Sequence, residues 1–446
     1  MSALLHHPSI HDYRQPVPSW WAASAGSPPS APRLDGELRV DVAVIGGGVT
    51  GLNAGISIVR DGGLSAAVLD AAPIGWGASG RNGGFCCLGS AKLSWPAIIR
   101  RFGLAEAQGF FRLQVAAIAH VRQRLADFAI DADAGAEGEA VIAHHPRAVA
   151  GLAEEAALYG EVFDTQCRLL SLPEVKERGL FTAEAQGALL VPHGFPLHPL
   201  KYVQGLARAA IAAGVALHGE SPVVAWTREG RLHRLTTPTG SVLADRVAVA
   251  TAGFTREDLH PGLAGRLLPV LSNIIVTRPL TAAERAEQRF DSLTMCADTR
   301  HLLHYFRLLP DGRLMFGARG GISASPAAEE AMKARLRRDI ARMFPVFTQA
   351  ETAYFWRGLT DLTFDLLPHF GTLDDESAHF LLGFHGNGVA MGSLGGSLLG
   401  RRVAGLPVDL PSVVSRPLRR FPLPYLRQTY LRAAYAAFSL RDAIGR

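Results

Sequence analysis

Cysteine is scarce in this sequence. The 446 residues include four cysteines, and none of them forms a C-x-x-C pair. The adjacent Cys86 and Cys87 could bond to each other only with strain, because a disulfide requires a favourable separation of its two Cα atoms. Neither a disulfide framework nor a zinc site is predicted, and we expect no bound metal.

Lysine is also rare. Only four of the 45 basic residues are lysines, and the 45 face 40 acidic residues, which leaves a net charge of +5. The basic residues form no dense block, so a nucleic-acid-binding surface is not predicted.

Long apolar runs are almost absent. Only residues 40–59, VDVAVIGGGVTGLNAGISIV, approach the ~20 apolar residues of a membrane span. Three consecutive glycines lie in its middle, where each would cost about 1 kcal/mol of helix propensity relative to alanine. Residues 1–18 contain three histidines and no apolar core, which is unlike a signal peptide. We therefore expect a cytoplasmic protein without an integral membrane segment.

The same run has the pattern of a strand, a tight turn and a helix. Gly46, Gly48 and Gly51 form G-x-G-x-x-G between a β-branched run and a stretch of apolar residues at helical spacing. Such glycines allow the turn, the approach of a pyrophosphate and close helix–strand packing. A second strand, SAAVLD, ends at Asp70, 70 − 46 = 24 residues after the first glycine, where a ribose-binding carboxylate is expected. These features together predict a dinucleotide site.

Two domains are predicted, because 446 residues with 48% hydrophobic content can bury two sizeable cores. HPLKYVQGLARAAIAAG predicts an amphipathic helix, SPVVAW a strand, and the segment that follows a hairpin ending at Ala252-Gly253. From about Pro269, VLSNIIVTRP and HYFRLLPDGRLMFGA predict antiparallel strands, the second pair joined by an Asp311-Gly312 turn. A charged helix is expected at about 327–343, before a glycine-rich turn that begins another helix.

The segments VAVIGGGVTGL, IGWGASGRNGG, HPLKYVQGLARAA, ATAGF, YFRLLPDGRLMFGA and GFHGNGVAMGSLGGSLL occur in this order. In this the chain resembles the glycine and D-amino-acid oxidase (DAO) family of FAD enzymes, and within it the gamma-glutamylputrescine oxidases. The resemblance implies an α/β (α+β overall) fold, a Rossmann-like FAD-binding domain with an interleaved antiparallel-sheet substrate domain. It also implies oxidation of a C–N bond in a small amine or amino acid.

The expected domain limits follow from this resemblance. The FAD-binding domain would comprise residues 37–130, 193–265 and 358–405, and the substrate domain 131–192 and 266–357. Residues 1–36 would form an N-terminal arm and linker, and 406–446 a C-terminal helical arm.

The resemblance also assigns cofactor contacts. The ADP half would be held by the first glycine motif, Asp70 and the backbone at Val223, with Ala252 and Gly253 near the pyrophosphate. A loop from Gly77 to Gly84 would pass the flavin ring. A late turn, Gly386-Asn387-Gly388, would place a helix N-terminus at the flavin's pyrimidine edge. The predicted cofactor-binding residues are Gly46, Gly48, Gly51, Asp70, Gly77, Ser79, Arg81, Asn82, Gly83, Val223, Ala252, Gly253, Gly386, Asn387, Gly388 and Val389.

Four residues are candidates for substrate binding and catalysis. Tyr305 and Arg307, two apart on a strand, share a face, and Phe316 is expected to join them across the turn. An aromatic wall with one guanidinium would suit a carboxylate-bearing amine, although a structural ion pair would explain Arg307 equally well. His198 and His385 adjoin the cofactor segments, and structural histidines are the alternative. Trp76 and Trp356 are expected to wall the pocket, with core packing as the alternative.

Two departures from relatives bear on the cofactor. The segment WRGLTDLT lacks the cysteine that attaches flavin in sarcosine oxidases, so FAD is expected to be noncovalent. No lysine follows IIVTRP closely, where those enzymes activate oxygen, so the electron acceptor stays open. A nicotinamide-dependent dehydrogenase and a flavin-binding protein without turnover are the alternatives, and the oligomeric state is not predicted.

Overall fold

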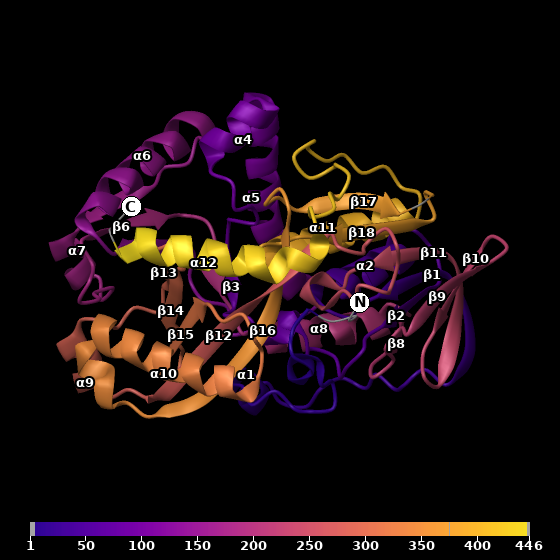
Figure 1. The fold of residues 1–446 in the computed structure, drawn as a ribbon, viewed down its shortest axis with the longest axis horizontal. Helices are drawn as coiled ribbons and strands as arrows, with labels where there is room; N and C mark the ends of the chain where they lie inside the picture. The colour runs from indigo at the N-terminus through magenta and orange to yellow at the C-terminus, as the bar shows by residue number, and fades with distance from the viewer. Residues whose placement is uncertain (1–4, 374, 444–446) are drawn as a thin grey trace.

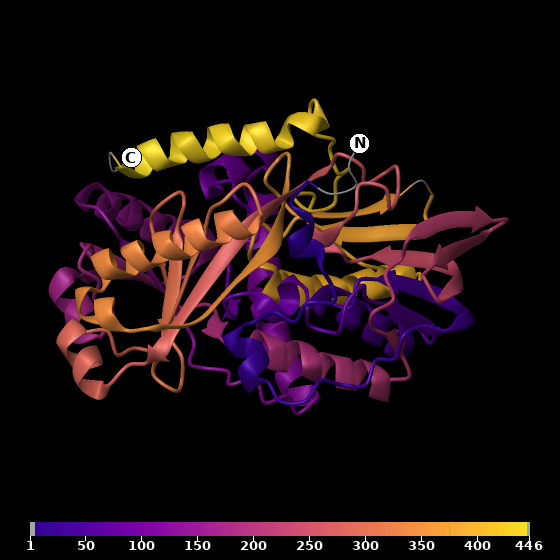
Figure 2. The same ribbon diagram turned by 60° about the horizontal axis from the view of Figure 1, so that its bottom comes forward.

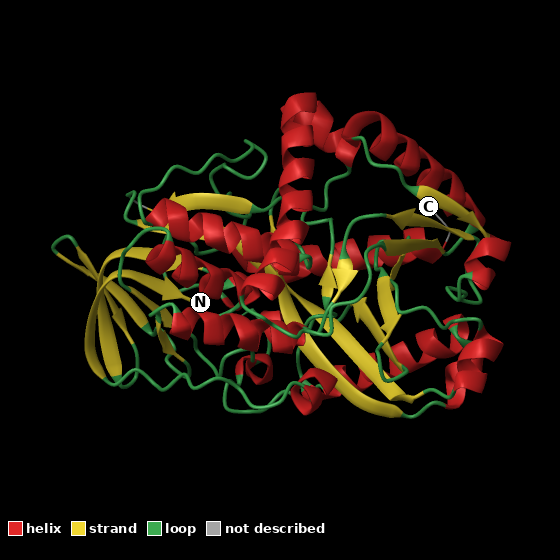
Figure 3. Ribbon diagram, turned by 180° about the vertical axis from the view of Figure 1, so that it is seen from behind, coloured by secondary structure: helices red, strands yellow, loops and turns green. Residues whose placement is uncertain are grey.

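Two eight-stranded sheets organise the protein (Figure 1). The computed structural model describes residues 5–373 and 375–443, so the outermost residues of both predicted arms lie outside the described part. Within that part, no helix is both long and apolar enough to cross a membrane. Figure 3 shows the two sheets side by side, with helices between and around them.

The first sheet has the order β17-β18-β11-β1-β2-β8, with parallel pairing from β18 to β8. An antiparallel hairpin extends from β11. Its strands are β1 (Gly36–Ile45), β2 (Ala66–Leu69), β8 (Ala216–His218), β9 (Ala225–Glu229), β10 (Leu232–Thr236), β11 (Gly240–Val249), β17 (His369–Leu373) and β18 (Ala378–Leu382). The predicted strand SPVVAW is misplaced, since β9 starts only at Ala225.

Small residues bring the helices α2 (Val49–Arg60) and α11 (Gly388–Val403) close together. A Cβ on Gly396 would lie 2.3 Å from the carbonyl oxygen of Thr50, and one on Gly400 would lie 2.3 Å from that of Ala54. The glycine-rich sequence of α11 is therefore needed for backbone-to-backbone packing, and it fixes the start of α11 beside the start of α2. The helices α5 (Leu104–Asp127) and α8 (Pro199–Ala212) complete this layer.

The second sheet has the order β16-β12-β15-β14-β13-β4-β6-β5 and is antiparallel except between β13 and β4. Two distant chain segments supply its strands: β4 (Glu139–Ala143), β5 (Arg168–Ser171), β6 (Gly187–Val191), β12 (Leu267–Pro279), β13 (Met295–Asp298), β14 (His304–Leu308), β15 (Arg313–Arg319) and β16 (Thr352–Thr363). The sheet is therefore interleaved with the first in sequence, as expected; the predicted domain limits stay a prediction. Its helices are α6 (Pro146–Phe163), α7 (Leu172–Glu177), α9 (Ala282–Gln288) and α10 (Pro326–Met343).

The turn between β14 and β15 corrects one expectation. Leu309 and Arg313 still pair through a backbone hydrogen bond of 2.9 Å, so three residues rather than two form the turn. Phe316 consequently pairs with Phe306, and Arg307 pairs with Met315. A shift of one residue reverses the face of every side chain, so Phe316 lies in the core on the other side of the sheet from Tyr305.

The remaining elements connect and cover the two sheets. The C-terminal helix α12 runs along the outside of the molecule, past the second sheet (Figure 2). These elements are η1 (Pro8–His11), α1 (Trp20–Ser24), α3 (Ala78–Arg81), β3 (Phe85–Cys86), α4 (Trp95–Phe102), β7 (Phe195–Pro196), η2 (Ala252–Phe254), η3 (Pro345–Gln349), η4 (Pro424–Leu426) and α12 (Arg427–Ala443).

Candidate active site

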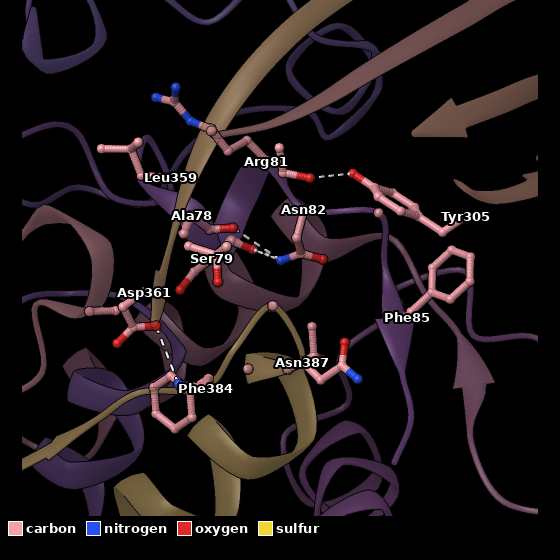
Figure 4. Close-up of a pocket in the computed structure, with 18 of the residues that line it drawn as sticks. Ala78, Ser79, Arg81, Asn82, Phe85, Tyr305, Leu359, Asp361, Phe384 and Asn387 are labelled. Atoms are coloured by element: carbon pink, nitrogen blue, oxygen red, sulfur yellow. Dashed lines mark hydrogen bonds between the residues drawn. The ribbon is translucent and has the colours of Figure 1, made fainter. Parts of the chain in front are cut away.

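A large cavity lies between the two sheets (Figure 4). Its empty volume, counting its opening to solvent, is about 1330 Å³. One wall comes from the starts of α2 and α11 and from the loop at residues 78–83, and the other from the second sheet.

The first glycine motif has two different physical roles. Gly46 has φ = +107°, and a Cβ there would lie 2.6 Å from the carbonyl oxygen of Ala250; one on Gly51 would lie 1.8 Å from that of Gly46. These two glycines are required by the fold itself. Gly48 has an ordinary φ of −82°, and a Cβ would meet only the Ser79 hydroxyl, at 2.5 Å. Gly48 thus keeps open the space in front of α2.

The N-terminus of α2 presents backbone donors to this space. Gly48 is its N-cap and supplies no side-chain acceptor, while Ser79 Oγ accepts a hydrogen bond from Val49 N at 3.0 Å. Asp70 accepts from Gly47 N at 2.8 Å, which ties the end of β2 to the turn. This helix N-terminus lines the cavity and suits an anion such as a pyrophosphate.

The loop at residues 78–83 is anchored from behind the cavity. Arg81 donates to the carbonyl oxygens of Trp76 and Arg357, and its guanidinium points away from the centre of the cavity (Figure 4). Trp356 Nε1 donates to the carbonyl of Arg81 and Trp21 Nε1 to that of Asn82, both at 2.8 Å. Trp76 and Trp356 are not among the residues lining the cavity, so they support the loop instead of walling the pocket.

A buried carboxylate holds the late turn in place. Asp361, on β16, accepts from the backbone N–H groups of Gly383 at 2.6 Å and Phe384 at 3.2 Å. Asn387 Nδ2 donates to the carbonyl of Leu88 at 2.7 Å, which links the turn to the loop after β3. The start of α11 is thereby fixed at the cavity wall.

Ten of the sixteen predicted cofactor residues line the cavity, and their contacts with FAD stay a prediction. They are Gly48, Ser79, Arg81, Asn82, Gly83, Ala252, Gly386, Asn387, Gly388 and Val389. Six are not among its lining residues: Gly46, Gly51, Asp70, Gly77, Val223 and Gly253.

Of the four catalytic candidates, only Tyr305 lines the cavity. Its hydroxyl is 2.8 Å from Ser272 Oγ, and its ring lies beside that of Phe85 (Figure 4). His198 is the N-cap of α8, where Nδ1 accepts from Lys201 N, and burial lowers its pKa to about 4. His385 is fully buried beside Thr363, and burial lowers its pKa to about 3. His198 thereby holds the backbone of Lys201 in place, and His385 contacts the Thr363 hydroxyl.

The structure places the Arg307 guanidinium away from the cavity, and its role in substrate binding stays a prediction. Its guanidinium lies behind Gly84, donates to the carbonyl of Leu197 at 2.8 Å, and sits 5.7 Å from the Trp21 ring. Among the described residues, no carboxylate forms an ion pair with Arg307, and Arg307 does not line the cavity. Tyr305 and Arg307 extend from the same face of the sheet, but only Tyr305 reaches the cavity. The Gly83-Gly84 loop lies between the Arg307 guanidinium and the cavity.

Sequence reasoning missed the charged residues that do line the cavity. Arg319, at the end of β15, donates to the carbonyl of His385 at 2.6 Å. Lys92 and Glu139 come from the loop after β3 and from the start of β4. Burial lowers the pKa of Lys92 to about 7 and raises that of Glu139 to about 7. Lys92 is one of only four lysines, and that rarity was the one available signal.

Known proteins resemble this chain over most of its length. Residues 41–402 match the family described as DAO, FAD dependent oxidoreductase. The chain belongs to this family. It is 28% identical over 430 residues to the gamma-glutamylputrescine oxidoreductase of Escherichia coli, covering 96% of this chain and 98% of that protein. It is also 29% identical over 396 residues to a probable oxidoreductase OrdL of Haemophilus influenzae, covering 88% and 89%.

Solved structures of this family share the fold. Glycine oxidase from Geobacillus kaustophilus superposes with a TM-score of 0.70 at 22% identity, over 86% of this chain and 99% of that one. L-proline dehydrogenase from P. horikoshii gives 0.68 at 16%, over 85% and 96%. The two-sheet architecture is therefore that of DAO-family flavoenzymes.

The residues present fit FAD. Gly48 leaves room for a pyrophosphate at the N-terminus of α2. The Val49 N–H, which donates to Ser79 Oγ in this structure, is the donor from which a phosphate oxygen would accept a hydrogen bond. The N-terminus of α11, with Gly386 at φ = +100°, offers a second set of backbone donors on the same wall of the cavity. A dinucleotide with a polar ring at its far end matches these two donor sets.

Substituting Gly317 by alanine should disturb the substrate wall without affecting FAD. A Cβ on Gly317 would lie 2.1 Å from Tyr305 Cζ, so the ring must move. We expect kcat/KM to fall by more than in Tyr305→Phe, which removes only the hydroxyl. Equal steady-state kinetics of Gly317→Ala and wild type, at equal FAD content, would show that the position of this ring is unimportant.

Proposed function

We propose that this DAO-family protein oxidises a C–N bond in a small amine or amino acid that carries a carboxylate. The observation that carries the proposal is the cavity: one wall fits FAD, and the other presents Tyr305 and Arg319. When bound, FAD would supply the acceptor for a hydride from the carbon next to the substrate nitrogen. The resulting imine hydrolyses to an aldehyde or keto product plus amine or ammonia, and the electrons pass to O2 or another acceptor.

The protein's own residues bind and orient the substrate in this proposal. Arg319 would pair with the carboxylate, because a planar guanidinium offers two parallel donors to it. The Tyr305 and Phe85 rings would exclude water from the reacting carbon. A neutral amine requires no protein base for hydride transfer, which agrees with the structural positions of His198 and His385. The name of the E. coli relative supports an amine substrate.

An anaerobic screen tests this function. Purified protein would be mixed with amines and amino acids under argon, and the flavin band at about 450 nm followed. Bleaching by a carboxylate-bearing amine supports the proposal, and a nicotinamide-dependent preparation without flavin would refute it. A flavin that no amine or amino acid reduces would favour a binding role without turnover.

FAD should leave the protein on denaturation. No cysteine lies in β16, so we expect acid precipitation to release all of the flavin into the supernatant. Cys87 is the only cysteine of the four that lines the cavity, and burial raises the pKa of its thiol. Colour kept in the pellet of wild type but not of Cys87→Ala would reveal a covalent link at this residue and refute the expectation.

A further inference from the structure

The N-terminal arm reaches the back of the loop at residues 78–83. Trp21 of α1 is buried, and its Nε1 donates to the carbonyl of Asn82 at 2.8 Å. The centre of its ring lies 4.7 Å from that of His198 and 6.2 Å from that of Trp356. Asn82 lines the cavity, whereas Trp21 does not. A residue 61 positions earlier in the chain thus holds one peptide group of the loop from outside the cavity.

The peptide group that Trp21 holds has a donor on its other side. In a trans peptide the C=O and the N–H that follows it point in opposite directions, so the Gly83 N–H points away from Trp21. Gly83 is buried and lines the cavity, and a Cβ on it would lie 2.9 Å from Tyr305 Cε2. In the described part of the chain the Gly83 N–H has no acceptor. Because buried backbone donors are almost always paired, this donor indicates that a bound molecule supplies the acceptor.

The groups next to this peptide are held without the arm. Asn82 Oδ1 accepts from Gly84 N at 2.8 Å, and the carbonyl of Gly84 accepts from Leu197 N at 2.8 Å. The Asn82 side chain is turned back into its own loop (Figure 4). Of these contacts, the one from Trp21 alone sets the direction of the Gly83 N–H.

The helix that carries Trp21 is itself fixed at both ends. Ser19 Oγ, at the N-cap, accepts a backbone N–H of the first turn at 3.1 Å. At the other end, Ser24 Oγ donates to the carbonyl of Trp20 at 2.6 Å and lies 3.1 Å from His198 Nε2. His198 Nδ1 accepts a backbone N–H of α8, so Nε2 carries the proton and donates to Ser24 Oγ. The Trp21 indole therefore has a defined position.

We propose that Trp21 is a positioning residue for the cofactor, which aims the Gly83 N–H at an acceptor atom on the ring system of FAD. The loop lies on the same wall as the N-terminus of α2, where the pyrophosphate would bind. The place of Gly83 beside Tyr305 puts the acceptor at the end of FAD that meets the substrate. This rests on the proposed function only in that FAD is the bound cofactor. The N-terminal arm is then part of the cofactor site, although none of its described residues lines the cavity.

Trp21→Phe tests the proposal, because it keeps an aromatic ring and removes the indole N–H. The dissociation constant of FAD would be measured from the flavin fluorescence released on diluting the loaded protein. It should rise roughly three- to tenfold, as expected for the loss of one hydrogen bond. Trp20→Phe is the matched control on the same helix. The Trp20 ring packs on that of Tyr354, and its indole N–H has no hydrogen bond in the described part of the chain, so FAD affinity should not change.

The reduction potential of the bound FAD is a readout that a purely structural role would leave unchanged. Reduced flavin carries more negative charge, and hydrogen bonds to charged acceptors are the stronger ones. Misdirecting the Gly83 N–H should therefore weaken the binding of reduced FAD roughly three- to tenfold more than that of oxidised FAD. For a two-electron couple this ratio lowers the potential by about 14–30 mV in Trp21→Phe. The potential would be measured with dithionite against a dye of known potential, without any amine.

Ser24→Ala is a second variant that leaves the Trp21 indole intact. It removes the hydroxyl through which His198 fixes the end of α1. The affinity for FAD and the potential should change in the same direction as in Trp21→Phe, and by less.

Other results would overturn the proposal. If Trp21→Phe lowers only the melting temperature, with FAD affinity and potential as in wild type, Trp21 is a core residue. If it raises the KM of an amine and leaves both FAD quantities unchanged, the Gly83 N–H binds the substrate and not the cofactor. If both FAD quantities change as expected and no amine reduces the flavin, this proposal stands and the proposed function fails.

Discussion

Gly48→Val is expected to yield a folded protein without FAD. The valine side chain would occupy the space in front of α2, where a Cβ already comes within 2.5 Å of Ser79 Oγ. The backbone itself should accept valine, because Gly48 has φ = −82°. We expect the absorbance at about 450 nm to vanish while the far-ultraviolet circular dichroism stays near wild type, and added FAD should no longer raise the melting temperature.

The matched control is Gly151→Val on α6. A Cβ there meets nothing within 4 Å, so this variant should keep its full FAD content. Gly46 and Gly51 would be poor choices, because substitution of either forces a collision with backbone. A yellow, fully loaded Gly48→Val protein would contradict the assignment of the glycine motif to the pyrophosphate.

Arg319→Lys is expected to cause the largest loss of substrate recognition. Lysine offers a point charge where arginine offers a planar fork, so the contact with a carboxylate weakens. Losing a charge-assisted hydrogen bond costs ~1.5–3 kcal/mol, roughly a ten- to hundredfold fall in kcat/KM. FAD content should stay unchanged, and substrates without a carboxylate should lose little.

Arg307→Lys is its matched control. Arg307 lies on the adjacent strand and is 3% exposed, but its guanidinium contacts the Leu197 carbonyl and not the cavity. Its replacement should lower the melting temperature and affect all substrates alike. The opposite pattern, a substrate-specific loss in Arg307→Lys alone, would restore the interpretation made from sequence.

The parts of the site that are local in sequence could be predicted. The strand, glycine turn and helix at residues 40–59 form one contiguous unit, and chain geometry fixes where its helix N-terminus points. The turn before α11 is local in the same sense. Ten of the predicted cofactor residues line one cavity, but only Gly48 among them came from the glycine motif, and the family resemblance assigned the other nine.

The substrate wall could not be predicted, because it depends on register and on distant segments. A three-residue turn in place of a two-residue turn moved Phe316 to the opposite face from Tyr305. Arg307 has the same face by periodicity, but the Gly83-Gly84 loop, more than 200 residues earlier in the chain, covers it. Lys92 and Glu139 line the same cavity only because the loop after β3 packs near the second sheet, and neither lies in a recognisable motif.

Anaerobic titration of the purified, FAD-loaded protein with a carboxylate-bearing amine tests the central claim most directly. The account predicts a yellow protein whose band at about 450 nm bleaches on adding the amine, with one equivalent of imine-derived aldehyde or keto product per flavin reduced. A colourless protein, or a flavin that no amine or amino acid reduces, would contradict it.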